Sequence, residues 1–176
     1  MRDLKAQPLQ FNFNCVNELY HGSKVIVKNP VIVNSYLTKD FGPGFYCIRI
    51  QTQAEKWARR RAKNGVGFVS VFTFDERYLR NYRVKLFKGY SKEWLDFVAN
   101  CRAGLPHDYD VVDGPVADDE VYDYVSDYLQ GKIHPAYFME MCKFKRPTNQ
   151  VCFCSQQLLD CAVEFSRAYE VRCYVR

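Results

Sequence analysis

The sequence lacks the short motifs that assign a chain to the commonest classes of enzyme. It contains no GxxxxGK[ST] phosphate loop, no HExxH zinc motif, no EF-hand calcium loop and no GxSxG nucleophile motif. No two cysteines have CxxC spacing, and the three histidines (His21, His107 and His134) are far apart in the chain. Because zinc sites usually draw ligands from closely spaced residues, we expect no bound metal.

Long apolar runs are also lacking. No stretch is long enough to cross a membrane, and residues 1–14 contain no apolar core of a secretory signal. We therefore expect a cytoplasmic protein with no membrane partner. In a reducing cytosol cysteines stay free and are commonly buried. We expect this state for all eight: Cys15, Cys47, Cys101, Cys142, Cys152, Cys154, Cys161 and Cys173.

Length and composition fit one globular domain covering residues 1–176. The chain is 48% hydrophobic and 26% charged, and it is long enough to bury a substantial core. It is rich in aromatic residues, with 13 Tyr and 13 Phe. These rings favour a β-rich core, and they could in addition provide stacking surfaces for a base or another ring.

Charge is unevenly distributed along a chain whose net charge is +5. Residues 56–63 (KWARRRAK) are strongly basic, whereas residues 107–127 contain eight carboxylates and no Lys or Arg. A basic helix can contact phosphates or an acidic partner, or it can be a solvated face. Because the net charge is small, the solvated face is the simpler interpretation.

Hydrophobic periodicity predicts strands and helices that are interspersed without regular βαβ units. This order indicates an α+β fold with mostly antiparallel strands. We expect strands at residues 16–20, 31–33, 45–48, 68–74, 84–87, 109–112, 150–154 and 169–175, with 68–74 buried on both faces. We expect helices at residues 52–64, 92–101, 118–130, 135–143 and 155–159, the third capped by Asp118 or Asp119.

Three separated segments carry most of the functional signal: LYHGS (19–23), DFGPGFYCIRIQTQAEKWA (40–58) and TNQVCFCSQQLL (148–159). In the second segment Gly42 and Gly44 allow a tight turn, and Phe45 and Tyr46 follow it directly. A rigid turn of this kind presents a ring either to the core or to a ligand.

In this order the three segments resemble conserved segments of the ADP-ribosyltransferases of the diphtheria-toxin and poly(ADP-ribose) polymerase type. In that family a first strand ends in His-Gly followed by Ser or Thr. An F-G-x-G-[IF]-Y segment then precedes a helix that carries another aromatic residue. The chain resembles more closely a bacterial family of transferase-like proteins, often encoded beside a small antitoxin-like protein, whose pattern includes D-x-V-x-GPVADD. Here residues 108–120 read DYDVVDGPVADDE, so the resemblance covers most of the chain.

The resemblance implies a fold of split antiparallel sheets with flanking helices and an NAD cleft between the sheets. NAD would be the substrate, cleaved at the bond between nicotinamide and ribose, and ADP-ribose would pass to a protein or nucleic-acid acceptor. Such a reaction builds positive charge on the ribose, as glycoside hydrolysis does. A small antitoxin-like protein is the implied partner.

The resemblance also implies roles for individual residues. His21 would hydrogen-bond a ribose hydroxyl, and the main chain of Gly22 would pair with the nicotinamide carboxamide. Tyr46 would stack on the nicotinamide ring, and Trp57 would close the other side or else pack in the core. The implied binding set is completed by Ser23 and Phe41.

Gln150 occupies the position at which the better-known family has an acidic residue. Glutamine can accept a hydrogen bond but supplies no charge beside the developing cation, which could cost about 10²–10³ in rate. Another carboxylate could substitute, and the candidates are Asp113, Asp118 and Asp119. Alternatively, Asp118 and Asp119 are helix caps, and the protein turns over slowly or only binds its ligand.

Three functions therefore stay open. The first is an intracellular mono-ADP-ribosyltransferase, which could act as the toxin of a toxin–antitoxin pair. The second is an NAD- or ADP-ribose-binding module without chemistry, which Gln150 favours. The third is a nucleic-acid-binding domain that uses the basic segment 56–63 together with aromatic residues.

Overall fold

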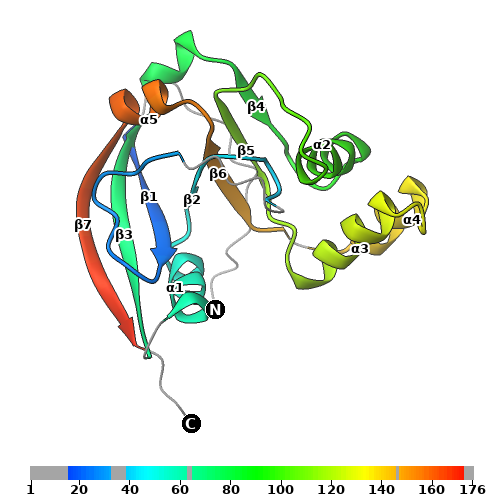
Figure 1. Cartoon of the computed structure of the whole chain (residues 1–176), viewed down its shortest axis with the longest axis horizontal. Helices are drawn as coiled ribbons and strands as arrows, with labels where there is room; N and C mark the ends of the chain where they lie inside the picture. Colours follow the sequence, from blue (N-terminus) through cyan, green and yellow to red (C-terminus); the bar gives the residue numbers. More distant parts are fainter. Residues whose placement is uncertain (1–15, 33–38, 63–64, 146, 173–176) are drawn as a thin grey trace.

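The computed structural model describes residues 16–32, 39–62, 65–145 and 147–172. Within these residues, seven strands form one mixed sheet in the order β4-β5-β6-β2-β1-β3-β7 (Figure 1). All neighbouring strands are antiparallel except β4 and β5, which are parallel. The strands are β1 (Val16–Ser23), β2 (Phe45–Ile48), β3 (Val66–Asp75), β4 (Val84–Leu86), β5 (Val111–Pro115), β6 (Asn149–Phe153) and β7 (Val163–Arg172).

Five α-helices and one 3₁₀ helix accompany the sheet within the described residues. Four α-helices begin at side-chain caps, because Ser91, Asp118, His134 and Ser155 each accept a hydrogen bond from the main chain of the first turn. The helices are α1 (Gln51–Arg61), η1 (Glu76–Asn81), α2 (Lys92–Arg102), α3 (Asp119–Leu129), α4 (Pro135–Cys142) and α5 (Gln156–Ala162).

The sheet consists of two halves, β4-β5-β6-β2 and β1-β3-β7, that meet at β1 and β2. All residues of these two strands are described, and the only pair between β1 and β2 is formed by Tyr20 and Ile48. By contrast, β1 pairs with β3 over its whole length. The two halves therefore diverge beyond this one pair, and Figure 1 shows β3 and β7 turned away from β5 and β6.

One face of each half contributes to a shared core. Phe72 and Phe74 of β3 meet Phe45 of β2 and Phe153 of β6, with ring centroids 5.5 and 5.1 Å apart. Leucines of α5 and of η1 complete this cluster. Since side chains alternate between the two faces of a strand, the opposite faces are left for the other helices.

Different helices cover the two outer faces. Helix α1 packs Ala54 and Ala58 against β3 and β7. Helices α2, α3 and α4 cover Val112 of β5 and Cys152 of β6. Figure 1 shows the same division, with α1 beside β1 and β2 and the other three helices beyond β5.

The prediction of an α+β fold with mostly antiparallel strands is confirmed. The predicted buried strand at 68–74 is also confirmed, because β3 lies between β1 and β7 with residues 69–72 buried. The strand predicted at 31–33 is wrong for Val31 and Ile32, which lie outside any strand, and Val33 falls outside the described residues. The main-chain N–H of Ile32 instead donates to Gln156 Oε1.

Several predicted boundaries also needed correction. Strand β5 begins at Val111 rather than at residue 109. Strand β7 begins at Val163 rather than at residue 169, because pairing with β3 extends it. The helix predicted to run to residue 64 ends at Arg61, because Ala62 is already outside it, and the predicted strand end at residue 175 lies outside the described residues.

Described cysteines are free, but they are not all buried. Four are buried, Cys154 is partly exposed and Cys161 is exposed, so the expectation of burial is wrong for Cys161. Cys15 and Cys173 lie outside the described residues. In the described part of the chain, no group of His, Cys, Asp and Glu residues is arranged to hold a metal ion.

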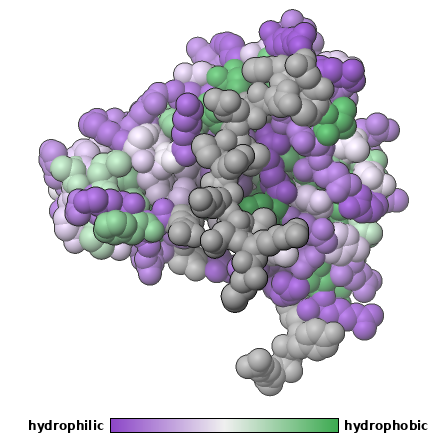
Figure 2. Space-filling model, turned by 180° about the vertical axis from the view of Figure 1, so that it is seen from behind, coloured by the Kyte–Doolittle hydropathy of each residue, from purple (hydrophilic) through white to green (hydrophobic). Residues whose placement is uncertain are grey.

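Hydrophilic residues dominate the face of the molecule seen from behind, where apolar residues appear in small groups (Figure 2). None of the described helices combines the length and the apolar character that a membrane span requires.

Candidate functional site

A cavity of about 450 Å³ lies where β1 and β2 diverge. Its walls come from both halves of the sheet, from α1 and from the turn that leads into α3. This volume is in the range of small-molecule sites. The cavity brings together five of the residues that the sequence predicted for a site: His21, Gly22, Tyr46, Trp57 and Gln150.

His21 is held in one orientation by two contacts. Its Nδ1 lies 2.7 Å from the main-chain oxygen of Tyr46, and its ring stacks on Phe45 with centroids 4.7 Å apart. Burial lowers the pKa of His21, and the nearby charges of Arg61 and Lys39 lower it further. A carbonyl can only accept, so the neutral ring carries its proton on Nδ1 and leaves Nε2 as an acceptor.

Tyr46 closes the turn that precedes it. Its hydroxyl donates to the main-chain oxygen of Gly42 at 2.6 Å and accepts from the main-chain N–H of Phe41 at 3.1 Å. Gly42 has φ of +73°, a conformation that glycine adopts without strain. Burial raises the pKa of Tyr46, so the phenol stays neutral. The turn therefore fixes the Tyr46 ring at the cavity, with Lys39 Nζ 5.2 Å from the ring centroid.

Gly22 is required by the packing of α1. A Cβ atom at this position would lie 2.1 Å from the main-chain oxygen of Ala54 and 2.8 Å from the nitrogen of Ala58. The resemblance implied that Gly22 is needed because a ligand lies against its main chain. The structure shows that the close approach of the helix is sufficient reason.

Trp57 lies on the cavity side of α1 and is half-buried. The guanidinium groups of Arg60 and Arg61 lie 5.5 and 5.4 Å from its ring centroid. Arg61 also lines the cavity, as does Lys39. This part of the site therefore combines an aromatic ring with positive charge.

Gln150 is bound to a carboxylate that the sequence analysis did not propose. Its Nε2 donates to Asp40 Oδ2 at 3.0 Å, and Asp40 is 8% exposed. Both residues line the cavity. Because the carboxylate takes the amide nitrogen, Gln150 Oε1 is left as an acceptor.

Asp40 is held in turn by a buried ion pair. Arg102 Nη2 donates to Asp40 Oδ1 at 2.6 Å, and the main-chain N–H of Ala117 donates to Oδ2 at 2.9 Å. The Arg102 side chain is 4% exposed and stacks on the ring of Tyr122 at 4.1 Å. The GPVADD segment thus reaches the site through Val116 and Ala117 rather than through Asp118.

Among the predicted residues whose side chains are described, Ser23, Phe41, Asp113 and Asp118 do not line this cavity. Ser23 is buried and donates to the main-chain oxygen of Val25, and Phe41 is buried in the cluster of α2, α3 and α4. Asp118 is exposed and accepts from the main-chain N–H of Val121, which confirms the cap interpretation. The side chain of Asp119 lies outside the description.

Asp113 points to the face of the sheet opposite Gln150. Gln150 is registered with Gly114 of β5, so Asp113 lies one residue away and projects to the other side. There it is fully buried, 3.3 Å from Arg49 Nη2, and Arg49 also binds Glu76 at 2.9 Å. Burial raises the pKa of Asp113 to about 6, although Arg49 opposes the shift.

Sequence reasoning missed Asp40, although it opens the quoted segment DFGPGFYC. The signal available was its position directly before the glycine turn, which is anchored beside the site. Arg61 belongs to the basic segment 56–63 that the sequence indicated for phosphates, whereas Tyr122 and Lys39 offered no such signal, because only the folded chain brings α3 and the turn together.

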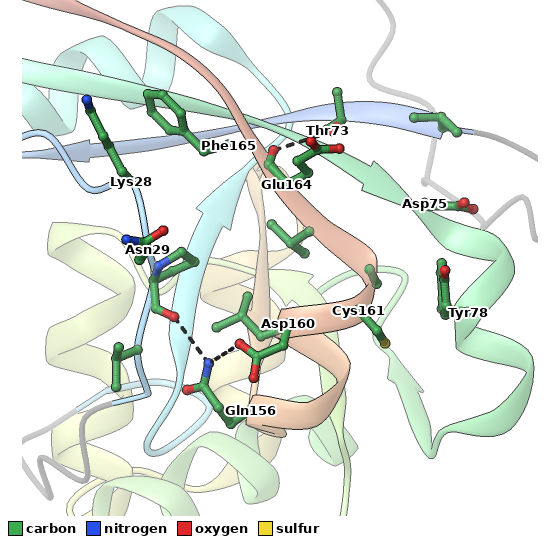
Figure 3. A pocket seen from close by; sticks show the side chains of 16 residues that line it. Lys28, Asn29, Thr73, Asp75, Tyr78, Gln156, Asp160, Cys161, Glu164 and Phe165 are labelled. Carbon is green, nitrogen blue, oxygen red and sulfur yellow. Dashed lines mark hydrogen bonds between the residues drawn. The ribbon is translucent and has the colours of Figure 1, made fainter.

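A larger hollow of about 970 Å³ contains none of the predicted site residues. It lies between β7, α5 and the segment before Val31, as Figure 3 shows. Gln156 anchors one wall, since its Nε2 donates to Pro30 O at 3.2 Å and to Asp160 Oδ1 at 2.7 Å (Figure 3). We therefore take the smaller cavity, with its convergent polar groups, as the candidate functional site.

Comparison with known proteins gives one family. No curated protein and no solved structure matches the chain. A family model does match, over residues 17–165, which begin in β1, end in β7 and include every residue named above for the cavity. The chain therefore belongs to the DUF3990 family, which is described as a protein of unknown function.

Proposed function

We propose that the protein is a mono-ADP-ribosyltransferase that cleaves NAD between nicotinamide and ribose. The single observation that carries the proposal is the convergence of His21, Tyr46 and Gln150 on one cavity from three different strands. These residues belong to the three sequence segments that resemble the ADP-ribosyltransferases. Had the imidazole and the phenol faced separate cavities, the proposed site would not exist.

The side chains of the cavity suit the steps of this reaction. His21 Nε2 accepts a hydrogen bond from a ribose hydroxyl, and the Tyr46 ring supplies a flat face for the nicotinamide ring. Cleavage transfers the electrons of the glycosidic bond to the departing nicotinamide, which leaves as a neutral ring. The ribose becomes positively charged as that bond breaks.

We assign to Asp40 the negative charge that Gln150 lacks. Gln150 Oε1 accepts from a second ribose hydroxyl while its Nε2 stays bound to Asp40. A carboxylate held in place near a developing cation stabilises it without reorganisation during the reaction. Asp40 thereby replaces Asp113 and Asp118, whose side chains lie outside the cavity.

The acceptor of ADP-ribose in this proposal is a protein or a nucleic acid, and a small antitoxin-like protein is the proposed partner. Arg61 and Lys39 at the cavity provide positive charge for the pyrophosphate of NAD or for an acceptor phosphate. The proposed location is the cytoplasm.

The experiment follows free nicotinamide after the full chain is mixed with NAD. We expect release by the unchanged protein and none above background by His21→Ala or Tyr46→Ala. Asp40→Asn should slow release by about 10²–10³ while it changes NAD affinity much less, because the lost charge acts mainly in the transition state.

Two matched variants control for general damage. His134 is exposed and caps α4. His134→Ala should therefore release nicotinamide at the unchanged rate, and Asp118→Asn should do the same. If His21→Ala and His134→Ala lose activity equally, or if the unchanged protein releases no nicotinamide, the proposal fails.

An NAD- or ADP-ribose-binding module is the second candidate, and the contacts of Asp40 favour it. Both carboxylate oxygens are already engaged, one with Arg102 and the other with Ala117 and Gln150. Saturable NAD binding that His21→Ala abolishes, without nicotinamide release, would support the module over the enzyme.

A further inference from the structure

A cluster of three cysteines and one histidine has no role in the proposed transferase site. Cys152 and Cys154 have their sulfur atoms 3.6 Å apart. The His107 ring lies near Cys154 and Cys101, and all three residues line one separate cavity of about 330 Å³.

The geometry points to a thiol modification site in which Cys154 reacts with a peroxide and Cys152 then closes a disulfide with it. This inference is independent of the proposed transferase activity. It rests on the cavity, on the contact between the two sulfur atoms and on the imidazole beside Cys154.

The structure distinguishes the two sulfur atoms. Cys154 follows the end of β6, where its main-chain N–H donates to Asp110 O at 2.8 Å, and its side chain reaches the cavity. Cys152 lies within β6 and is fully buried against the core of α2, α3 and α4. A reagent can therefore enter at Cys154, and Cys152 is placed to attack from behind.

The neighbours of Cys154 favour its thiolate form. The hydrogen bond with Cys152 lowers the pKa of Cys154 to about 6, with a further contribution from His107 and against the effect of burial. Both nitrogens of the His107 ring are engaged, since Nε2 donates to Phe41 O at 3.1 Å and Nδ1 accepts from the main-chain N–H of Tyr109 at 3.2 Å.

Other charged groups of the cavity are largely balanced. Lys39, Arg83, Asp108 and Asp110 contribute to its lining. Arg83 lies 3.5 Å from Asp110 and 3.8 Å from Asp108. Asp110 raises the pKa of Cys154, so the imidazole and the second thiol outweigh it.

The proposed chemistry balances with a peroxide as the oxidant. The Cys154 thiolate attacks one peroxide oxygen, so that an S–O bond forms, the O–O bond breaks and hydroxide leaves. The sulfur of Cys152 then attacks the sulfenic sulfur of Cys154. An S–S bond forms, the S–O bond breaks and water leaves, so two thiols are oxidised while the peroxide is reduced.

The first test measures alkylation of each cysteine in the unchanged full chain by iodoacetamide at pH 6.5, located by fragment-ion mass spectrometry. Cys161 is the internal control, because it is more exposed than Cys154. We expect Cys154 to react about fivefold faster than Cys161, since a larger thiolate fraction outweighs its lower intrinsic nucleophilicity. Faster alkylation of Cys161 would overturn the inference.

A pH profile separates the role of His107 from packing. The alkylation rate of Cys154 should level off above about pH 7, and in His107→Gln it should keep rising beyond pH 8. Identical profiles in the two proteins would show that the imidazole does not activate the thiol.

The second test adds one equivalent of hydrogen peroxide. We expect a disulfide between Cys152 and Cys154 in the unchanged protein and in Cys101→Ser. In Cys152→Ser, a sulfenic acid on Cys154 should be trapped by dimedone, and in Cys154→Ser neither product should form. A disulfide to Cys101, or oxidation of Cys161 before Cys154, would contradict the assignment.

Discussion

At the scale of single residues, the candidate site depends on a carboxylate and an amide acting as a pair. Gln150 binds Asp40 at 3.0 Å, and Asp40 is fixed by Arg102 and by the main chain of Ala117. In the proposed reaction, the charge that Gln150 of β6 lacks is therefore supplied by Asp40, which directly precedes the glycine turn. Under the proposed function, this placement lets Asp40 stabilise the developing cation although position 150 is Gln.

Gly22 allows a direct test of close packing. Gly22→Ala should lower the free energy of unfolding by about 3 kcal/mol or more, because the new Cβ would overlap the main chain of Ala54 and no flexible side chain can move aside. Denaturant unfolding measures this loss. Gly89→Ala is the matched control, since nothing lies within 4 Å of a Cβ there. Equal effects of the two substitutions would refute the packing role of Gly22.

At the scale of elements, several helices begin where their sequence signals lie. Ser91, Asp118 and Ser155 each cap the helix that follows, and Pro135 occupies the first position of α4. Local hydrogen bonds of this kind depend on a few neighbouring residues. They can therefore be predicted from the sequence, whereas the start of β7 cannot, because it depends on pairing with β3.

The assignment of Asp118 as a cap predicts a loss of stability without a loss of function. Asp118→Ala should lower the free energy of unfolding by about 1 kcal/mol, because the N–H of Val121 loses its acceptor. Asp123→Ala, at an exposed position of the same helix, should change stability much less. Thermal unfolding and nicotinamide release are measured on the same variants. A loss of release without a loss of stability would show that Asp118 acts in the site rather than as a cap.

At the scale of the whole molecule, a buried charge cluster bridges elements from both halves of the sheet. Arg49, just after β2, binds Glu76 of η1 and Asp113 of β5. Asn17 of β1 donates to Glu76 at 3.0 Å, and Asn149 of β6 reaches Asp113 at 3.5 Å. Since β1 and β2 share a single pair, this cluster helps to hold the halves together.

Asp113 should make stability depend on pH. Its pKa in the folded protein is about 6, above the ordinary value of 3.8. Between these values the folded state holds more protons than the unfolded state, so this group's contribution to stability falls as pH rises from about 4 to 6. The loss amounts to about 3 kcal/mol at 1.4 kcal/mol per pKa unit.

Asp113→Asn removes that titration. The free energy of unfolding of the variant, relative to the unchanged protein, should therefore increase between pH 4 and pH 7. Urea unfolding at several pH values measures the difference. Parallel curves for the two proteins would show that Asp113 is ionised in the folded state throughout this range.

The local sequence determined the α+β class, most helix starts and the segments that carry His21, Tyr46 and Gln150, because caps, glycine turns and side-chain alternation act over a few residues. Only the tertiary structure decided that Asp40 stands beside Gln150 and that Asp113 lies on the opposite face. It also packs α1 so closely against Gly22 that no Cβ atom fits there, and it brings His107 near Cys154. The physical reason is strand pairing: register and the face that a side chain takes depend on partners far away in the chain, which no local pattern encodes.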